Sequence, residues 1–151
     1  KIKDYVDLII VSMHWGEEYT NKQNANQERI ANYLSSLGVN LIIGHHPHVV
    51  QPVTYINDTL VIYSLGNFIS NQLVLDKQDG IFNRSIGLMV GVDIKLEEDK
   101  PILEVSHLEL LFSYSDNSTN FKVIPFSKLN DELLNGYKDI ENKYMNVVKG
   151  V

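Results

Sequence analysis

Residues 41–68 read LIIGHHPHVVQPVTYINDTLVIYSLGNF, and this stretch decides how the rest of the chain is interpreted. Its apolar run, Leu41–Ile43, stops at Gly44, and three histidines follow within four residues: His45, His46 and His48. A continuous apolar run that ends in glycine and polar residues is typical of the carboxyl end of a strand in an α/β sheet, where ligands bind. Imidazole is the commonest metal ligand in proteins and titrates near neutral pH. The stretch therefore predicts a metal or catalytic site at a strand end.

A second buried run, residues 6–12, leads to another histidine, His14. Between the two runs, residues 24–37 carry apolar side chains at helical spacing, with Asn24 or Asn26 as the N-cap and Gly38 as the stop. Strand, helix and strand in succession predict a parallel βαβ unit, with the first strand covered on both faces. Its strand ends meet at one edge of the sheet. We therefore expect the side chains of His14 and His48 to converge within roughly 4–8 Å, a span that one or two ions can bridge.

Pro47 suggests how the histidines after Gly44 are oriented. A proline biases the preceding residue, here His46, toward an extended backbone. In an extended chain, side chains two residues apart point to the same side. His46 and His48 are therefore expected to face one ion, or two neighbouring ions.

Polar and aromatic residues of two loops complete the candidate site. Trp15 and Tyr19 either form a wall of the site or pack against the core, and Glu17 and Glu18 either ligate, act as bases or are simply solvated. The Asn67 amide either orients a histidine or caps a turn. We assign Trp15, Glu17 and Asn67 to substrate binding.

The remaining sequence predicts the rest of one α/β domain, residues 1–151. Asn57-Asp58 marks a hairpin turn between strands at 49–56 and 59–64. Residues 70–84 are polar and lack periodicity, so we expect a loop more mobile than its neighbours, placed where it can cover the site. Beyond it, the patterns predict an antiparallel pair at 85–96 and 102–112, a loop at 113–120, a short strand at 121–126 and a closing helix at 128–148 that Ser127 caps.

Composition excludes several function classes. The 151 residues carry a net charge of −6 with no run of Lys or Arg, so a nucleic-acid partner is not expected. No apolar run approaches the ~18 residues that a membrane span needs. The chain has no cysteine, so any metal must take nitrogen and oxygen ligands.

Three motifs together resemble one protein family. They are Ser12–Tyr19 (SMHWGEEY), Gly44–Val49 (GHHPHV) and Tyr63–Phe68 (YSLGNF). Their order and spacing resemble the CapA family of bacterial capsule synthesis proteins, which is associated with poly-γ-glutamate and is similar to the calcineurin-like metallophosphoesterases. The resemblance covers about residues 5–95.

The resemblance implies a fold and a metal centre. The fold is the C-terminal half of a metallophosphatase-like sandwich of two mixed sheets flanked by helices. The superfamily's late ligands fall on His14, His46 and His48, with His45 as the catalytic acid. Because the superfamily pattern is Gly-His-x-His, His45 remains an alternative ligand to His46. The metals would be divalent ions such as Mn²⁺, Zn²⁺, Fe²⁺ or Mg²⁺.

The superfamily's early Asp and Asn-His ligands have no counterpart in this sequence, so we expect an incomplete metal site here. The abrupt start, Lys1–Tyr5, suggests a fragment whose partner is the N-terminal part of the same protein. Membrane components of a capsule synthase and a second copy of the fragment are further expected partners. The expected location is the extracellular face of the bacterial envelope, held there by an anchor upstream of this sequence. The function remains open between a metal-dependent hydrolase, a non-catalytic accessory or polymer-binding protein, and a phosphoesterase unrelated to capsule.

Overall fold

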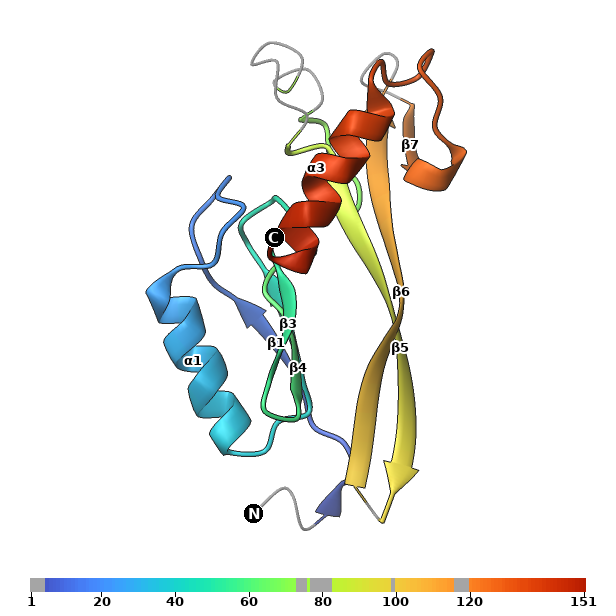
Figure 1. The fold of residues 1–151 in the computed structure, drawn as a ribbon. Coiled ribbons are helices and arrows are strands. Elements are labelled where there is room, and N and C mark those ends of the chain that lie inside the picture. Colours follow the sequence, from blue (N-terminus) through green and yellow to red (C-terminus); the bar gives the residue numbers. More distant parts are fainter. Residues whose placement is uncertain (1–4, 73–75, 77–82, 99, 116–119) are drawn as a thin grey trace.

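The computed structural model describes residues 5–72, 76, 83–98, 100–115 and 120–151, which form the elements in Figure 1. The strands are β1 (Ile10–His14), β2 (Leu41–His45), β3 (Val53–Ile56), β4 (Thr59–Ile62), β5 (Ile86–Glu97), β6 (Lys100–Ser115) and β7 (Phe121–Pro125). The helices are α1 (Ala25–Ser36), a 3₁₀ turn η2 (Phe126–Lys128) and α3 (Tyr137–Lys149). Two sheets, in the orders β1-β2-β4-β3 and β5-β6-β7, contain these strands.

The first sheet contains the expected βαβ unit. Strands β1 and β2 run parallel, β2 and β4 run parallel, and β3 and β4 form the antiparallel hairpin around Asn57. The hairpin strands are shorter than predicted at their outer ends. The prediction that the first strand spans 6–12 and is covered on both faces is wrong. The strand begins at Ile10 and lies at the sheet edge, where Ile10 is 51% exposed.

Helix α1 forms where the sequence predicts it. Asn24 accepts a hydrogen bond from the Gln27 backbone N–H, and the Gln27 side chain accepts one from the Asn24 backbone N–H, which completes a capping box. Gly38 follows the helix with φ 78°, an angle that favours glycine and turns the chain toward β2. Ala31 and partly buried Ile30 and Leu34 pack on Ile42 and Val61 of the sheet.

Figure 1 shows α1 on one side of the first sheet and the long β5–β6 pair on the other. Leu41, Leu60 and Ile62 of the first sheet pack with Leu103 of β6. A larger cluster lies under α3, where Tyr144 and Val148 meet Phe112 and Leu110. The arrangement is α/β with one mixed and one antiparallel sheet flanked by helices, as expected for a metallophosphatase-like fragment. No helix in the described residues is long and apolar enough to cross a membrane.

The closing helix is shorter than predicted. Its expected start near Ser127 is wrong, because α3 begins at Tyr137 after Gly136, whose φ is 70°. Asn130 and Asp131 explain the difference: their side chains accept hydrogen bonds from the backbone N–H groups of Leu133 and Gly136, which stabilises turns instead of a helix. The predicted mobile loop, 70–84, lies mostly outside the described residues. Within it, the carboxylate of Asp76 is fully buried.

Candidate histidine site at the sheet edge

The two strand ends bring histidines together as predicted. His14 and His45 are the last residues of β1 and β2 and pair directly across the parallel strands. His46 follows at once, and its ring centroid lies 4.5 Å from that of His14 and 6.1 Å from that of His48. We call His14, His46 and His48 the histidine cluster. The expected meeting of the two strand ends is confirmed, whereas the expected distance of roughly 4–8 Å between the side chains of His14 and His48 stays a prediction.

The backbone that carries the cluster differs from the prediction. His46 has φ 99° and His48 has φ 61°, so the extended conformation expected before and after Pro47 is wrong. The rings meet because the chain bends sharply here. Tyr19, which contacts His48 with 6.0 Å between ring centroids, also has a positive φ of 63°. Positive φ in non-glycine residues is costly and concentrates at functional sites. Three of the five such residues in the described part of the chain lie here.

His48 has the most polar contacts of the cluster. Its Nδ1 lies 3.0 Å from Oδ1 of Asn67, in the loop after β4. Its Nε2 lies 3.9 Å from Oε1 of Glu18. The Tyr19 backbone N–H donates to the Pro47 carbonyl at 2.8 Å, which ties the loop after β1 to the histidine turn. Asn67 therefore contacts a histidine, one of the two arrangements that the sequence left open.

Trp15 occupies the core beside the site. It is 5% exposed, and its Nε1–H donates to the Tyr63 carbonyl at 2.9 Å. Gly44 makes this contact possible, because a Cβ there would lie 1.9 Å from the Tyr63 carbonyl oxygen and 2.5 Å from Trp15 Nε1. Burial, and to a smaller degree Glu28, raises the pKa of the Tyr63 phenol. Trp15 thus packs in the structure, and a contact between Trp15 and substrate stays a prediction.

His45 and Glu17 are exposed. The His45 carbonyl accepts the Trp15 backbone N–H at 3.1 Å, and the ring contacts found among the described residues join His46, not His45, to His14. This geometry favours His46 over His45 as a member of the cluster. The roles proposed for His45 as an acid and for Glu17 and Asn67 as substrate contacts stay predictions.

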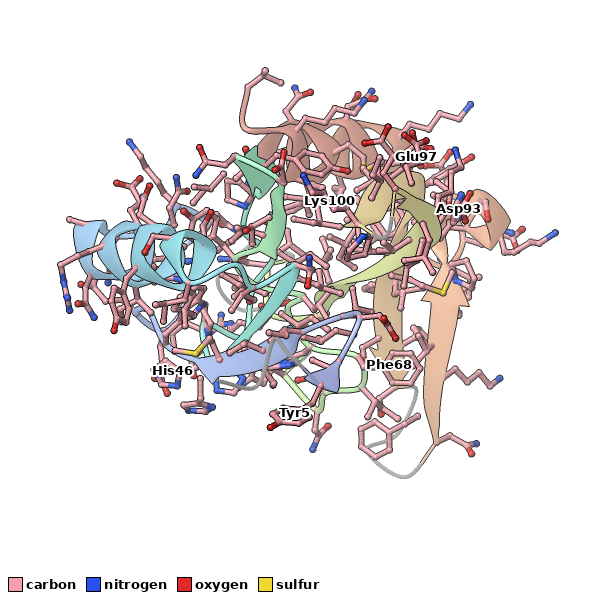
Figure 2. The ribbon with its side chains drawn as sticks, turned by 90° about the horizontal axis from the view of Figure 1, so that it is seen from below. Tyr5, His46, Phe68, Asp93, Glu97 and Lys100 are labelled. Atoms are coloured by element: carbon pink, nitrogen blue, oxygen red, sulfur yellow. The ribbon has the colours of Figure 1, made fainter. Side chains whose placement is uncertain are left out.

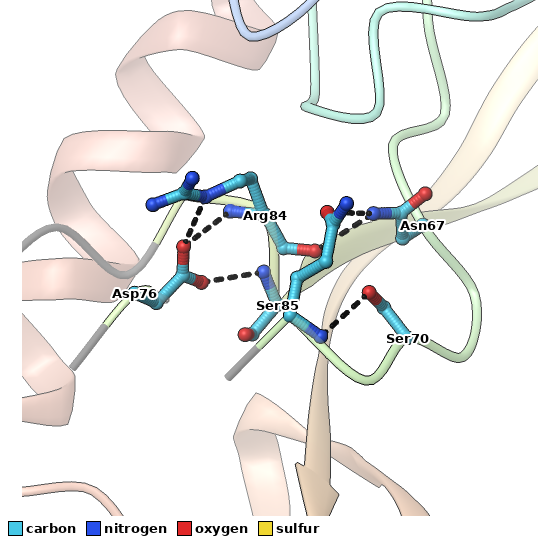
Figure 3. A network of polar contacts seen from close by, with 6 residues as sticks. Asn67, Ser70, Asp76, Arg84 and Ser85 are labelled. Carbon is cyan, nitrogen blue, oxygen red and sulfur yellow. Dashed lines mark hydrogen bonds and ion pairs between the residues drawn. The ribbon is translucent and has the colours of Figure 1, made fainter. Parts of the chain in front are cut away.

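Sequence reasoning missed two buried polar groups that hold the site. Gln27 and Gln51 are fully buried; Gln27 Nε2 donates to Gln51 Oε1 at 2.8 Å, and Gln51 Nε2 donates to the Thr20 carbonyl at 2.7 Å. The second group joins Asp76, Arg84 and Asn67 (Figure 3). The sequence gives little sign of either group, because isolated Gln, Asp and Arg residues are usually exposed.

The described residues alone do not fit a metal centre. Among them, no group of three His, Asp or Glu side chains is arranged to hold one ion. The three imidazoles are neutral ligands, and Glu18 lies 3.9 Å from Nε2 of His48. Hard two-metal centres need several anionic oxygens. No catalytic step through a metal follows from these residues.

Comparison with known proteins shows which family the segment that carries the site is similar to. Residues 1–72 match the model of the bacterial capsule synthesis protein PGA_cap. The chain is 44% identical over 70 residues to the PGA biosynthesis protein CapA of Bacillus subtilis (strain 168), a match that covers 46% of this chain and 18% of that protein. It is also 44% identical over 70 residues, again 46% of this chain, to the capsule biosynthesis protein CapA of Bacillus anthracis, where the match covers 17% of the relative.

The matched part of the chain therefore covers less than a fifth of the length of each curated relative. Both relatives are named for capsule or polymer biosynthesis, which is consistent with the cell envelope. The matched region contains the whole histidine cluster together with His45 and Asn67. Residues 1–72, just under half of the chain, are thus similar to bacterial capsule synthesis proteins.

Proposed function

We propose that this chain is part of a protein of poly-γ-glutamate capsule biosynthesis and that the histidine cluster is its working site. The observation that carries the proposal is the position of the family match: residues 1–72 include both strand ends and the turn that bring His14, His46 and His48 together. Positive backbone angles at His46 and His48 support it, because such angles persist where the surroundings impose them.

The cluster offers nitrogen lone pairs and a nearby carboxylate at an accessible edge. His14 is exposed, and His46 and His48 are half-buried. We propose that these three imidazoles are part of a ligand set for divalent metal ions, which carboxylates from the N-terminal part of the same protein complete. When bound, such ions would polarise a phosphoryl or carbonyl group. The chain's own contribution is to orient the rings, through Asn67 at His48 and through the bend at Pro47.

Exposed apolar residues on the side of the molecule that also carries His46 support a partner segment there. In Figure 2, Tyr5, His46 and Phe68 lie along the same side of the view. Tyr5 is 86% exposed and Phe68 is 68% exposed, and Ile10 on edge strand β1 is half exposed. Edge strands and exposed apolar patches favour association. We propose that the N-terminal part of the protein covers this side, on the extracellular face of the envelope, with an anchor and synthase membrane components completing the assembly.

A chimera tests the proposal. Residues 1–72 of this chain replace the corresponding segment of Bacillus subtilis CapA in a host that makes poly-γ-glutamate and lacks its own copy. The measured quantity is polymer released per cell. We expect the chimera to restore production, and we expect His46→Ala and His48→Ala each to reduce it at least about tenfold. Tyr33→Ala, an exposed change on the outer side of α1, is the matched control and should have no effect.

The outcomes separate the candidate functions. A chimera that accumulates normally but makes no polymer contradicts the capsule assignment. Full production by both histidine variants, at normal protein levels, contradicts the working-site assignment and favours an accessory role. If the His45→Ala chimera still makes polymer and the His46→Ala chimera does not, the result supports the geometric choice of His46 over His45.

A further inference from the structure

Asn67 holds an amide whose orientation can be assigned from its neighbours. Its Nδ2 lies 2.9 Å from the backbone carbonyl oxygen of Arg84 and 3.3 Å from Oε1 of Gln72. A backbone carbonyl can only accept a hydrogen bond, so the group that faces it must be the amide NH₂. The other end of the amide, Oδ1, therefore faces Nδ1 of His48 at 3.0 Å. Figure 3 shows Asn67 reaching the Arg84 backbone.

The amide orientation fixes the proton on His48. Oδ1 of an amide can only accept, so Nδ1 of His48 must donate. A neutral imidazole carries one proton, and with that proton on Nδ1 the lone pair is on Nε2. Nε2 faces Oε1 of Glu18 at 3.9 Å, too far for a hydrogen bond between them. Neutral His48 thus carries its free electron pair on Nε2, the ring nitrogen on the Glu18 side.

The chain beyond the family match holds Asn67 in this orientation. Asp76 is fully buried, and its carboxylate accepts the Arg84 Nε–H and the Ser85 backbone N–H, each at 2.8 Å (Figure 3). These bonds fix the Arg84 backbone, whose carbonyl accepts from Asn67. The Arg84 guanidinium also lies 5.5 Å from the ring centroid of Tyr19, which contacts His48. Two segments around the site are therefore held by one buried ion pair.

We propose that Asn67 is a positioning residue that keeps neutral His48 in the Nδ1–H tautomer. Nε2 of His48 is then the acceptor. Asp76 and Arg84, which lie outside the matched region, hold Asn67 in place. The proposal rests on the proposed function only in taking His48 as a working residue. The tautomer itself is a property of this chain that can be measured without polymer synthesis or metal.

Long-range proton–nitrogen correlation spectra of the 151-residue chain test the proposal. They distinguish a protonated ring nitrogen from an unprotonated one, and at about pH 8.5 histidines with an ordinary pKa of ~6.5 are neutral. We expect His48 to show a protonated Nδ1 and an unprotonated Nε2. Asn67→Leu, which removes the acceptor at nearly constant volume, should shift His48 toward the Nε2–H tautomer that free imidazole side chains prefer.

Two controls separate positioning from folding. Asn71→Leu makes the same change at an exposed asparagine four residues away and should leave the His48 pattern unchanged. The signals of His107, remote on β6, report that the fold is intact in each variant. A wild-type His48 protonated at Nε2, or an Asn67→Leu protein with an unchanged His48 pattern, overturns the proposal. If Asn67→Leu does not fold, the wild-type spectrum decides, since it must show a protonated Nδ1 on His48.

Discussion

His46 has an unusual backbone for a residue with a side chain. Its φ of 99° lies beyond the left-handed helical region, where a Cβ meets steric conflict. Such a conformation costs on the order of 1–3 kcal/mol and persists only where the surroundings impose it. Buried Pro47 and Val49 on either side of His48, together with the hydrogen bond from Tyr19 to Pro47, supply those surroundings. The strain is the local cost of directing the His46 ring toward His14.

Two substitutions at His46 separate the strain from the ring. His46→Ala and His46→Gly both remove the imidazole, but only glycine adopts this φ without conflict. We expect the glycine variant to be more stable than the alanine variant by about 1–2 kcal/mol in urea unfolding. At most helix and strand positions glycine is the less stable of the two, so the reversed order is diagnostic. Equal stabilities, or a more stable alanine variant, would contradict strain at His46.

At the scale of single residues, the sequence predicts only part of the site. The meeting of His14 with the residues after Gly44 follows from two apolar runs in a parallel unit, a property that sequence patterns express well. The bend was not predictable, because Pro47 biases His46 toward an extended backbone and tertiary packing overrides that bias. The contact between His48 and Asn67 depends on that bend and on the loop after β4, which no local pattern encodes.

At the scale of elements, a pair of buried glutamines joins α1 to both loops of the site. Gln27 comes from the first turn of α1 and also fills the space beside Gly16, where a Cβ would lie 2.9 Å from Gln27 Cδ. Gln51 donates to the carbonyls of Thr20 and Lys22 in the loop after β1. The loop that carries Tyr19 and the turn that carries His48 therefore share one buried support.

A double-mutant cycle measures that support. Gln51→Leu leaves the Gln27 amide and two loop carbonyls without this partner, so we expect a loss of about 2–3 kcal/mol in the free energy of unfolding. Gln27→Leu should cost a similar amount. Because each single variant leaves the other glutamine unsatisfied, the double variant should lose less than the sum of the two by about 1 kcal/mol or more. Strictly additive losses would show that the two side chains act independently.

Helix α3 gives a pH-dependent test of packing. Burial, with Asp76 adding a smaller effect, raises the pKa of the Tyr144 phenol from 10.0 to about 12. The folded state therefore favours the neutral phenol. Its contribution to stability is complete below pH 10 and is lost as the pH rises toward 12, by about 2–3 kcal/mol in total. We expect the free energy of unfolding to fall more steeply above pH 10 in the wild-type protein than in Tyr144→Phe.

Tyr33 provides the control for that measurement. It is 62% exposed on α1, so Tyr33→Phe should follow the wild-type curve between pH 9 and pH 12. Parallel curves for the wild-type protein and Tyr144→Phe would show that Tyr144 ionises as easily in the folded state as in the unfolded state. The same result would show that the surroundings of the Tyr144 hydroxyl are more polar than the apolar cluster under α3 indicates.

At the scale of the whole molecule, the two sheets depend on each other. The Tyr55 hydroxyl of β3 donates to the Leu103 carbonyl at 3.0 Å and accepts the Val105 backbone N–H at 3.2 Å, which connects the first sheet to β6. Leu103 also packs into the first sheet. The part outside the family match thus completes the core behind the histidine cluster. The sequence predicted strands of both sheets, whereas the connection of the sheets through Tyr55 has no signal in hydrophobic periodicity.

The 151-residue chain should bind divalent metal only weakly. Three neutral imidazoles offer little charge to offset a dication, so we expect dissociation constants of roughly 0.1–1 mM for Mn²⁺ and Zn²⁺, equivalent to about 4–5.5 kcal/mol. Calorimetric titration measures this, with His46→Ala/His48→Ala as the test variant. His107→Ala is the control, because His107 is exposed beside Glu109 on β6. Tight binding of two ions that the double variant abolishes, together with phosphodiester turnover, would show a complete site within these residues.

The most direct test of the histidine site is whether the rings of His14 and His46 touch in solution. Nuclear Overhauser effects between imidazole ring protons report only protons in near contact, and the ring centroids lie 4.5 Å apart. We predict cross-peaks from His46 to His14 and none from any of the cluster to His107. Cross-peaks from His14 to His45 in place of His46 would contradict the choice of His46, and the absence of cross-peaks between the two strand ends would contradict a site built where β1 and β2 terminate.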